Sequence, residues 1–240
     1  MPRFYCHSSL SPDTLFRLPE NTVRHINSLR LKNGTIITLF NGDGCEYIAQ
    51  LHIDGKNAYF AKIAACNEIN RESSLHITLI QAISTGEKMD FTVQKAVELG
   101  VAEIYPVMSA FSNVRLSDER AEKRHRRWQE ITIAACEQCG RNIVPIIHPV
   151  QKLTALLNAL PHSDLRLFLS PQGSLKFNQI KQTPNTVTLL IGAEGGFSAD
   201  EEQTAQNAGF QSIQLGKRIL RTETAGLATI SAIQTRWGDF

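Results

Sequence analysis

A glycine-rich turn near the C-terminal end of the chain has the residue types of a ligand-binding turn. An apolar run, residues 186–191, is followed at once by GAEGGFS, whose glycines and glutamate are Gly192, Glu194, Gly195 and Gly196. The run predicts a buried strand, and glycine lets the backbone turn tightly and approach a ligand. Ligands of open α/β sheets bind at the carboxyl ends of strands, so the turn is a candidate site; a purely structural turn is the alternative.

The turn differs from two familiar glycine-rich phosphate loops. Its spacing departs from G-x-G-x-x-G, and QSIQLG, about 20 residues further on, offers no acidic residue for an adenosine ribose. No Gly-Lys-Ser or Gly-Lys-Thr follows, so the turn is not a P-loop. The sequence therefore argues against an NAD site and leaves the ligand open.

A second candidate is the cationic loop LGKRILRTETAG, residues 215–226. Lys217, Arg218 and Arg221 stand among apolar residues just before Thr222, which we expect to be the N-cap of the last helix. Cations beside a helix N-terminus suit an anion. The alternative is a solvated cationic loop in front of a buried helix.

Basic residues also open a long helix that we expect over residues 118–139. The cations are Lys123, Arg124, Arg126 and Arg127. They suit nucleic-acid phosphates, but a solvated helix face that pairs with neighbouring glutamates is the simpler interpretation. At the far end, Cys136 and Cys139 form a Cys-x-x-Cys pair; no second pair completes a zinc site, which favours buried thiols over a metal.

A fourth candidate lies near the N-terminus. Basic residues there are interleaved with aromatic and apolar ones: Arg3, His25, Arg30 and Lys32 with Phe4, Tyr5 and Leu31. Cations beside aromatic rings suit RNA, because bases stack on rings and phosphates pair with cations. An ordinary domain surface explains the same residues.

The sequence predicts two kinds of domain that position these residues. The first seventy or so residues alternate short apolar runs with the turn signals NGDG and IDGKN, which predicts a small β-rich domain. From Leu75 strand-like and helix-like segments alternate, which predicts a parallel sheet covered by helices. The polar stretch CNEINRESS marks the junction.

Local signals after the glycine turn predict a helix. Ser198 and Glu201 have the spacing of a capping box, and Gly209 can end the helix after Ala208 in the left-handed conformation. Strand, turn and helix in this order fit an α/β domain, and periodicity alone predicts an ordinary doubly wound sheet.

Composition narrows the class of protein. Of 240 residues, 42% are hydrophobic, the formal net charge is +2, and five cysteines are scattered along the chain. These values predict a globular protein with free thiols in the reducing cytoplasm. No apolar stretch reaches the roughly 20 residues of a membrane span, and the polar N-terminus lacks the apolar core of a secretion signal, so we expect no membrane partner.

Five phrases resemble one family closely and span nearly the whole chain. They are HINSLRLKNGTIITLFNGDG, KMDFTVQKAVELGVAEIYPV, RWQEITIAACEQCGRNIVP, LLIGAEGGFS and LGKRILRTETAG. The chain resembles the ribosomal RNA small subunit methyltransferase E family of SPOUT methyltransferases. The last two phrases, in this order near the C-terminus, are the most specific part of the resemblance.

The resemblance implies a two-domain α/β protein. It places a PUA-like, RNA-binding β-barrel in residues 1–70 and a SPOUT methyltransferase domain in residues 75–240. A deep trefoil knot in roughly residues 165–240 would bind S-adenosylmethionine. The implied protein is a homodimer that needs no metal and acts on 16S rRNA, in the assembled 30S subunit. Periodicity could not have indicated the knot, because knots are rare.

The resemblance also assigns residues to the cofactor. They are Leu169, Ile191, Gly192, Glu194, Gly195, Gly196, Leu215, Gly216, Ile219, Leu220, Thr222 and Ala225. The glycines would bring the backbone close to the bent cofactor, and apolar side chains would enclose its adenine. The cations of the third and fourth candidates are the predicted rRNA contacts.

The implied reaction is methyl transfer to N3 of a uracil in 16S rRNA. Uracil N3 carries a proton at neutral pH, so either a base must accept it or the uracil anion must be stabilised at its carbonyl oxygens. Arg221 and Arg141 are the candidates for stabilising the anion, and Glu194 and Glu223 are the candidates for the proton acceptor.

Two other functions compete with this interpretation. A module that only binds rRNA would explain the basic residues, but it would not explain the glycine turn and the cationic loop. A nucleotide-dependent oxidoreductase would explain the sheet and the turn, but the acidic ribose partner is missing.

Overall fold

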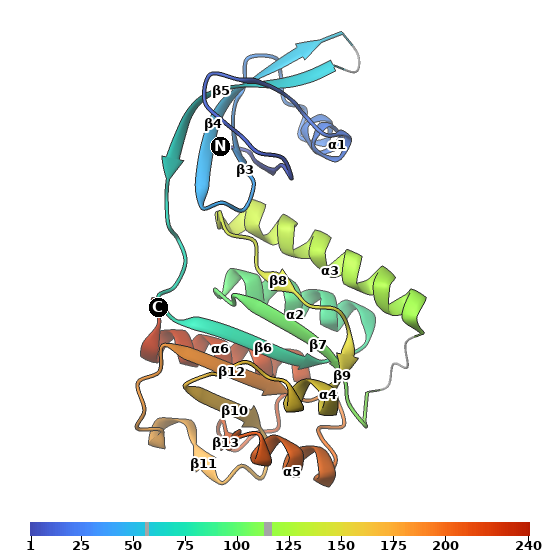
Figure 1. The fold of residues 1–240 in the computed structure, drawn as a ribbon, viewed down its shortest axis with the longest axis vertical. Helices are drawn as coiled ribbons and strands as arrows, with labels where there is room; N and C mark the ends of the chain where they lie inside the picture. The colour runs from blue at the N-terminus through green and yellow to red at the C-terminus, as the bar shows by residue number, and fades with distance from the viewer. Residues whose placement is uncertain (56–57, 113–116) are drawn as a thin grey trace. The chain divides into compact units, whose positions relative to one another are not determined.

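The computed structural model describes residues 1–55, 58–112 and 117–240, which form two compact units (Figure 1). The first unit is Met1–Glu72 with Cys136–Val144, and the second is Ser73–Ala135 with Pro145–Phe240. The segment Cys136–Val144 therefore belongs by its contacts to the first unit, although it follows residues of the second in the sequence.

The first unit is a β-sheet with one complete helix among its described residues. The elements are β1 (Arg3–Tyr5), β2 (Leu15–Arg17), α1 (Glu20–Ser28), β3 (Ile36–Phe40), β4 (Cys45–Asp54) and β5 (Ala58–Glu68). The strands pair in the order β1-β3-β4-β5-β2, and only β1 and β3 are parallel within the described residues.

Apolar alternation and glycine turns explain this sheet. Ile37 and Leu39 of β3 and Leu51 of β4 are fully buried in one core cluster. Both glycines of NGDG have a positive φ, so this turn between β3 and β4 is confirmed. The turn expected at IDGKN includes Lys56 and Asn57, which lie outside the described residues.

The second unit alternates strands and helices, as the sequence pattern predicts. Its elements are β6 (His76–Ala82), α2 (Gly86–Glu98), β7 (Glu103–Met108), α3 (Asp118–Cys139), β8 (Ile146–Ile147), β9 (Gln151–Lys152), α4 (Leu153–Asn158), β10 (Leu165–Leu169), β11 (Leu175–Lys176), η1 (Phe177–Gln179), β12 (Thr186–Ile191), α5 (Ala199–Asn207), β13 (Gln211–Gln214) and α6 (Thr222–Trp237). The last turn of α3 belongs to the first unit. The helix expected over residues 118–139 is confirmed with the same bounds.

The sheet of the second unit has an apolar core on each face. Its strands lie in the order β11-β13-β10-β12-β6-β7-β8, β9 pairs with β7 beside β8, and every strand pair among the described residues of this sheet is parallel. Ile77 and Leu79 of β6 share a core with residues of α2, α3 and α6. Ile80 and Ala82 share another core with residues of α4 and α5. Helices therefore cover both faces of the sheet (Figure 1).

The helix starts near the candidate loops agree with the sequence, with one correction. Ser198 and Glu201 form both hydrogen bonds of the predicted capping box. The N-cap of α6 is Arg221 rather than Thr222, and it makes no side-chain capping hydrogen bond. The expectation failed because the Thr222 hydroxyl has another partner: it donates to Gly192 O at 2.5 Å.

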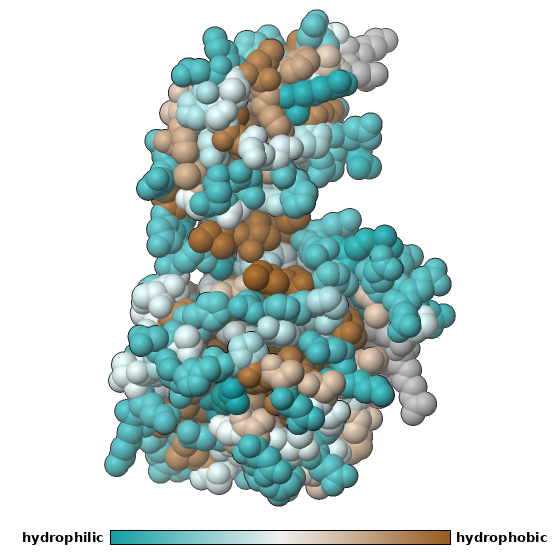
Figure 2. Space-filling model, viewed as in Figure 1, coloured by the Kyte–Doolittle hydropathy of each residue, from teal (hydrophilic) through white to brown (hydrophobic). Residues whose placement is uncertain are grey.

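Most side chains on the surface of the second unit visible in Figure 2 are hydrophilic, as expected if its apolar faces are buried. On the face of the second unit drawn in Figure 2, hydrophilic side chains dominate, and the apolar ones form separate small groups. Within residues 1–55, 58–112 and 117–240, no helix is both long enough and apolar enough to cross a membrane.

Candidate active site

A cavity of ≈ 570 Å³ lies at the carboxyl ends of strands in the second unit. Its wall includes the last residues of β10, β12 and β13, the loops that follow them, the start of α6 and one residue of α2. Carboxyl ends of parallel strands meet at one edge of a sheet, so stretches far apart in the sequence converge there. The volume is that of a small-molecule site.

The two loops singled out in the sequence both line this cavity. The predicted cofactor residues on its wall are Leu169, Ile191, Gly192, Glu194, Gly196, Leu215, Gly216, Ile219, Leu220, Thr222 and Ala225. Gly195 is not among the lining residues. A Cβ on Gly195 would lie 2.9 Å from the Cβ of Phe111, so this glycine makes room for a side chain of the protein itself.

The backbone of the glycine turn fixes its shape. The Gly196 amide donates to Ala193 O at 2.9 Å, and Gly196 has a φ of 71°, which favours glycine. A Cβ on Gly192 would lie 3.1 Å from the Gly196 backbone, closer than a side chain normally sits. The turn therefore favours glycine at both positions, and the two glycines keep this part of the wall free of side chains.

Lys88 and Glu194 form an ion pair on the cavity wall. Lys88 Nζ lies 3.1 Å from Glu194 Oε1, and the two side chains are 33% and 25% exposed. Partial burial alone would raise the pKa of the Glu194 carboxyl, but hydrogen bonds from the backbone and the Lys88 ammonium lower this pKa below its usual value. Glu194 is therefore an anion at neutral pH and a weak proton acceptor.

The cationic loop presents exposed charges to the cavity. Lys217, Arg218 and Arg221 line it and are exposed. Their side chains have no hydrogen bond or ion pair within the described part of the chain. Ile219 between them is 84% exposed. Cations without a protein partner on a largely apolar wall can interact with an anion or with charge that develops during a reaction.

Glu223 lies on the first turn of α6, beside the cavity residue Thr222. Its Oε2 is buried and accepts no hydrogen bond from the described residues. Glu223 itself does not line the cavity. Of the two glutamates considered as proton acceptors, Glu223 is the one whose carboxylate is not held by a lysine in the described structure.

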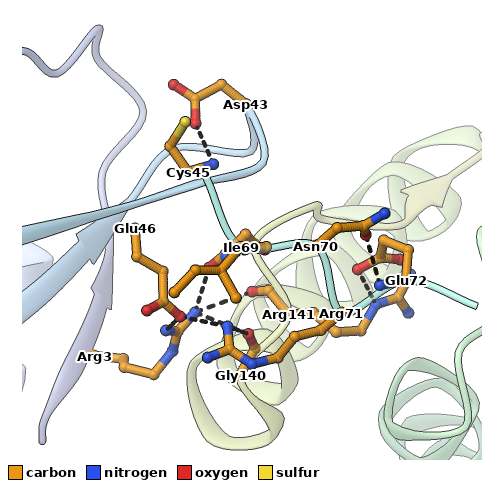
Figure 3. Close-up of polar contacts among 11 residues, drawn as sticks. Arg3, Asp43, Cys45, Glu46, Ile69, Asn70, Arg71, Glu72, Gly140 and Arg141 are labelled. Carbon is orange, nitrogen blue, oxygen red and sulfur yellow. Dashed lines mark hydrogen bonds and ion pairs between the residues drawn. The ribbon is translucent and has the colours of Figure 1, made fainter. Parts of the chain in front are cut away.

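In the first unit, two arginines are held by protein partners (Figure 3). Arg3 and Arg71 form ion pairs with the same carboxylate oxygen of Glu46. Arg3 also donates to Gly140 O at 3.1 Å and to Asn142 Oδ1 at 2.8 Å. The Arg3 side chain is 13% exposed. Its guanidinium, which the sequence suggested for RNA, is therefore occupied by its own unit.

Arg141, a candidate for stabilising the uracil anion, is also held by a carboxylate. It pairs with Glu72, and its Nε donates to Glu72 Oε1 at 3.0 Å (Figure 3). Both residues belong to the first unit, and Arg141 is not among the residues that line the cavity. Its surroundings are those of a buried structural arginine.

The other candidate RNA contacts of the first unit differ in exposure. His25 Nδ1 lies 3.4 Å from Glu137 Oε2, and its ring meets the Phe4 ring edge-on at 5.2 Å. Arg30 and Lys32 are exposed, and their side chains have no polar partner among the residues described. Arg30 and Lys32 therefore remain available to phosphates.

The cations of α3 also divide into those that pair with a carboxylate and those that do not. Arg127 pairs with Asp90 at 2.7 Å, and Arg126 pairs at 3.7 Å with a glutamate one turn earlier on the helix. Lys123 is exposed and Arg124 is half-buried. Neither Lys123 nor Arg124 forms an ion pair with a residue that the structure describes.

The cysteines are free thiols, as expected: Cys6, Cys45, Cys66, Cys136 and Cys139. Cys136 is fully buried, and this burial raises the pKa of its thiol to about 12. Cys139 is only half-buried. The interpretation of the Cys-x-x-Cys pair as buried thiols is therefore confirmed for Cys136 and is wrong for Cys139, which lies where α3 ends.

Sequence reasoning missed other residues of the cavity wall: Lys88, Ser170, Pro171, Ala193 and Gln214. Ser170 and Pro171 directly follow β10, and Gln214 ends β13, so their positions at strand ends were a usable signal. Lys88 had no local signal, because it lies on a helix whose place beside the glycine turn depends on the tertiary fold.

Similar proteins were found by sequence and by structure. A ribosomal RNA small subunit methyltransferase E from Buchnera aphidicola subsp. Acyrthosiphon pisum is 35% identical over 245 residues, covering 100% of this chain and 95% of that protein. A crystal structure of a ribosomal RNA small subunit methyltransferase E from Neisseria gonorrhoeae, bound to S-adenosyl methionine, has a TM-score of 0.93 and 47% identity, covering 100% of this chain and 99% of that chain. A methyltransferase from Legionella pneumophila in complex with the bound cofactor SAM has a TM-score of 0.94 and 39% identity, covering 99% and 98%.

Family descriptions match both parts of the chain. An RNA methyltransferase domain matches residues 71–234, and an RNA methyltransferase PUA domain matches residues 18–64. The fold and the site thus define an RNA methyltransferase with an N-terminal PUA-like β domain and a parallel α/β domain. The chain belongs to the ribosomal RNA small subunit methyltransferase E family.

Proposed function

We propose that the protein transfers the methyl group of S-adenosylmethionine to N3 of a uridine in 16S rRNA. The observation that carries the proposal is the cavity at the carboxyl edge of the parallel sheet, because the glycine turn and the cationic loop both line it. Membership of the small subunit methyltransferase E family and two similar structures with this cofactor support it.

The chemistry of the cavity wall fits this cofactor. Apolar side chains suited to an adenine ring are Leu169, Pro171, Ile191, Leu215 and Leu220. Gly192 and Gly196 leave backbone at the wall, where a Cβ on Gly192 would crowd the turn. When bound, S-adenosylmethionine supplies a methyl group on a sulfonium, which is a good leaving group and needs no metal to activate it. The protein must then align the nucleophile and handle the uracil proton.

Arg221 is the residue that we assign to the uracil anion. Its guanidinium is exposed on the cavity wall and has no protein partner in the described structure. Donated hydrogen bonds to a uracil carbonyl oxygen would stabilise the charge that develops when N3 loses its proton. Arg141 is the weaker candidate, because Glu72 already occupies its guanidinium.

For the N3 proton we assign Glu223 as the acceptor. Glu223 does not itself line the cavity, but it directly follows Thr222, which does, and its buried Oε2 has no hydrogen-bond donor among the described residues. Glu194 is less suitable, because the Lys88 ammonium pairs with it and its carboxyl pKa is lowered. Glu223→Gln should therefore reduce the methylation rate while leaving cofactor affinity unchanged.

We assign rRNA phosphate contacts to the cations without protein partners. These are Arg30 and Lys32 of the first unit and Lys123 and Arg124 of α3. Arg3, His25, Arg126 and Arg127 contribute less, because carboxylates already compete for them. Counterion release from neutralised phosphates makes this binding dependent on salt.

The proposal includes a trefoil knot in roughly residues 165–240 and a homodimer that packs through α6. The half-buried residues Leu227, Ala228, Ser231 and Ala232 lie on one face of this helix, and the last three are small, which suits close packing against a second copy. Light scattering should therefore give twice the mass of one chain. Free thiols and an rRNA substrate favour the cytoplasm.

Labelled S-adenosylmethionine tests the reaction directly. The purified protein is incubated with unmodified 30S subunits, with naked 16S rRNA and with 50S subunits, and labelled nucleosides are identified and mapped. We expect N3-methyluridine at one position, formed fastest in 30S subunits. Cofactor binding without any transfer would contradict the reaction, and label in another base would contradict the N3 assignment.

A further inference from the structure

Gln81 is a buried polar residue that none of the proposed steps uses. It lies one residue before the end of β6 and is 0% exposed. Side chains alternate along a strand, so Gln81 shares a face with Ile77 and Leu79, which pack in the core that includes α6.

The hydrogen bonds of Gln81 fix the orientation of its amide. Its Nε2 donates to Ala82 O and to Thr222 Oγ1, each at 3.0 Å. A backbone carbonyl can only accept, so the amide nitrogen, and not the amide oxygen, must be the atom that faces these partners. The amide therefore acts on Thr222 as a donor only.

That donor determines where the Thr222 proton goes. A threonine hydroxyl has a single proton, and Thr222 Oγ1 already accepts from Gln81. The proton is then directed to Gly192 O, which lies 2.5 Å away. Gln81, Thr222 and Gly192 thus connect β6, the start of α6 and the turn after β12. Thr222 and Gly192 line the cavity.

The other end of the amide argues against a role in stability alone. Gln81 Oε1 is buried and has no hydrogen-bond partner among the described residues. A Cβ on Gly226 of α6 would lie 3.5 Å from this oxygen, so the helix passes close to it. A buried acceptor without a donor destabilises the folded state. An apolar side chain of equal length would remove this penalty together with the two hydrogen bonds of the amide, so we expect little net change in stability.

We infer that Gln81 is a positioning residue of the cofactor cavity. It orients the Thr222 hydroxyl onto Gly192 O and so holds the glycine turn against the start of α6. The inference rests on the proposed function in one respect, because it takes S-adenosylmethionine as the ligand of the cavity.

Gln81→Met tests the inference, because methionine has similar length but no amide. We expect the Kd for S-adenosylmethionine, measured by calorimetry, to rise by about five- to tenfold, the effect of one lost hydrogen bond. Unfolding of the cofactor-free variant should require about as much denaturant as the wild type, because the lost hydrogen bonds and the removed unpaired oxygen have opposite effects. The Gly196 amide, which bonds to Ala193 O, should exchange its hydrogen faster in the cofactor-free variant.

Gln234→Met is the matched control. Gln234 is a second glutamine with 0% exposure; it lies on α6, and its Nε2 donates to Leu99 O at 2.8 Å. It does not line the cavity. We expect this variant to lose stability and to keep the wild-type Kd. If Gln81→Met also kept the wild-type Kd and the wild-type exchange of Gly196, the inference would be overturned.

Variants of Thr222 give a second, independent test that leaves Gln81 in place. Thr222→Val removes the hydroxyl and should raise the Kd, whereas Thr222→Ser should restore it. In the Thr222→Val background, Gln81→Met should add nothing, because both changes break the same connection. Additive effects would overturn the inference. If the wild type failed to bind S-adenosylmethionine, the proposed function would fail, and hydrogen exchange at Gly196 would still decide the role of Gln81.

Discussion

Two arginines of the first unit and one arginine of the second unit have opposite surroundings. In the first unit the Arg3 and Arg141 side chains are 13% and 6% exposed, and each pairs with a glutamate. In the second unit Arg221 is exposed on the cavity wall and has no partner among the described residues. A buried guanidinium requires a carboxylate, whereas an exposed one keeps its donors for a ligand. Neighbouring carboxylates, rather than residue type, decide which role an arginine takes.

Glu46→Gln should have the largest effect on the first unit. The variant keeps the shape of the side chain but leaves Arg3 and Arg71 without their shared carboxylate. Breaking a buried ion pair from one side costs about 3–5 kcal/mol in the free energy of unfolding. Denaturant unfolding of the cofactor-free protein measures this loss. Cofactor affinity of the folded fraction should be unchanged, and a variant as stable as the wild type would contradict a structural role for Arg3.

The same carboxylate predicts a dependence of stability on pH. Burial alone would raise the pKa of Glu46, but the guanidiniums of Arg71 and Arg3 lower it below its usual value. A lowered carboxyl pKa stabilises the fold above the unfolded pKa of about 4.3, and this contribution is lost as the pH falls through the folded pKa. The wild type should therefore lose more stability on acidification than Glu46→Gln, as measured by unfolding at a series of pH values.

Arg221→Ala should have the largest effect on the chemistry of the second unit. Removing the donor to the developing anion should lower the methylation rate at saturating rRNA by about 10²-fold or more. The free energy of unfolding should hardly change, because Arg221 has no partner to leave unpaired among the described residues. A variant with normal turnover and weak rRNA binding would instead make Arg221 a residue that positions the rRNA.

Gly192→Ala should weaken cofactor binding by a smaller factor. The new Cβ would lie 3.1 Å from the Gly196 backbone, so the turn must widen at the cavity wall. We expect the Kd for S-adenosylmethionine to rise by about tenfold, which corresponds to about 1.4 kcal/mol. Gly86→Ala is the control, since a Cβ there would meet nothing within 4 Å. Equal Kd values for the two variants would contradict the assignment of the turn.

Lys123→Ala and Arg126→Ala should give the smallest effects, and they extend the contrast between free and paired cations to α3. Lys123 has no ion pair in the described structure, whereas Arg126 lies 3.7 Å from a glutamate carboxylate. In a plot of log affinity for rRNA against log salt concentration, the slope should become shallower by about one unit at most for Lys123→Ala, and by less for Arg126→Ala. A larger loss for Arg126→Ala would reverse the assignment.

Local signals predicted the elements well because they depend on near neighbours in the sequence. The strand at residues 186–191, the capping box from Ser198 to Glu201 and the helix over residues 118–139 all formed where expected. The N-cap of α6 was placed one residue late, because Thr222 prefers a carbonyl that only the folded turn brings near. The position of the glycine turn at a strand end predicted a ligand site there, and the family resemblance assigned residues of the cationic loop to the same ligand; both loops line one cavity.

Contacts between distant residues could not be predicted in the same way. Nothing near Arg3 in the sequence indicates Glu46, and nothing near Gly195 indicates Phe111. A basic residue beside an aromatic ring gives the same sequence pattern whether its charge pairs with a carboxylate of the protein or with an rRNA phosphate. The sequence therefore identified the cations, and only the tertiary structure separates paired from unpaired ones.

The pH dependence of the methylation rate tests the role of Arg221 most directly. Single-turnover rates on 30S subunits are measured for the wild type and Arg221→Ala from about pH 6 to about pH 9, at saturating cofactor. If Arg221 stabilises the uracil anion, the wild-type rate levels off at lower pH while the rate of the variant continues to rise, so the deficit narrows as solvent ionises the base. A deficit that stays constant at every pH would contradict anion stabilisation by Arg221.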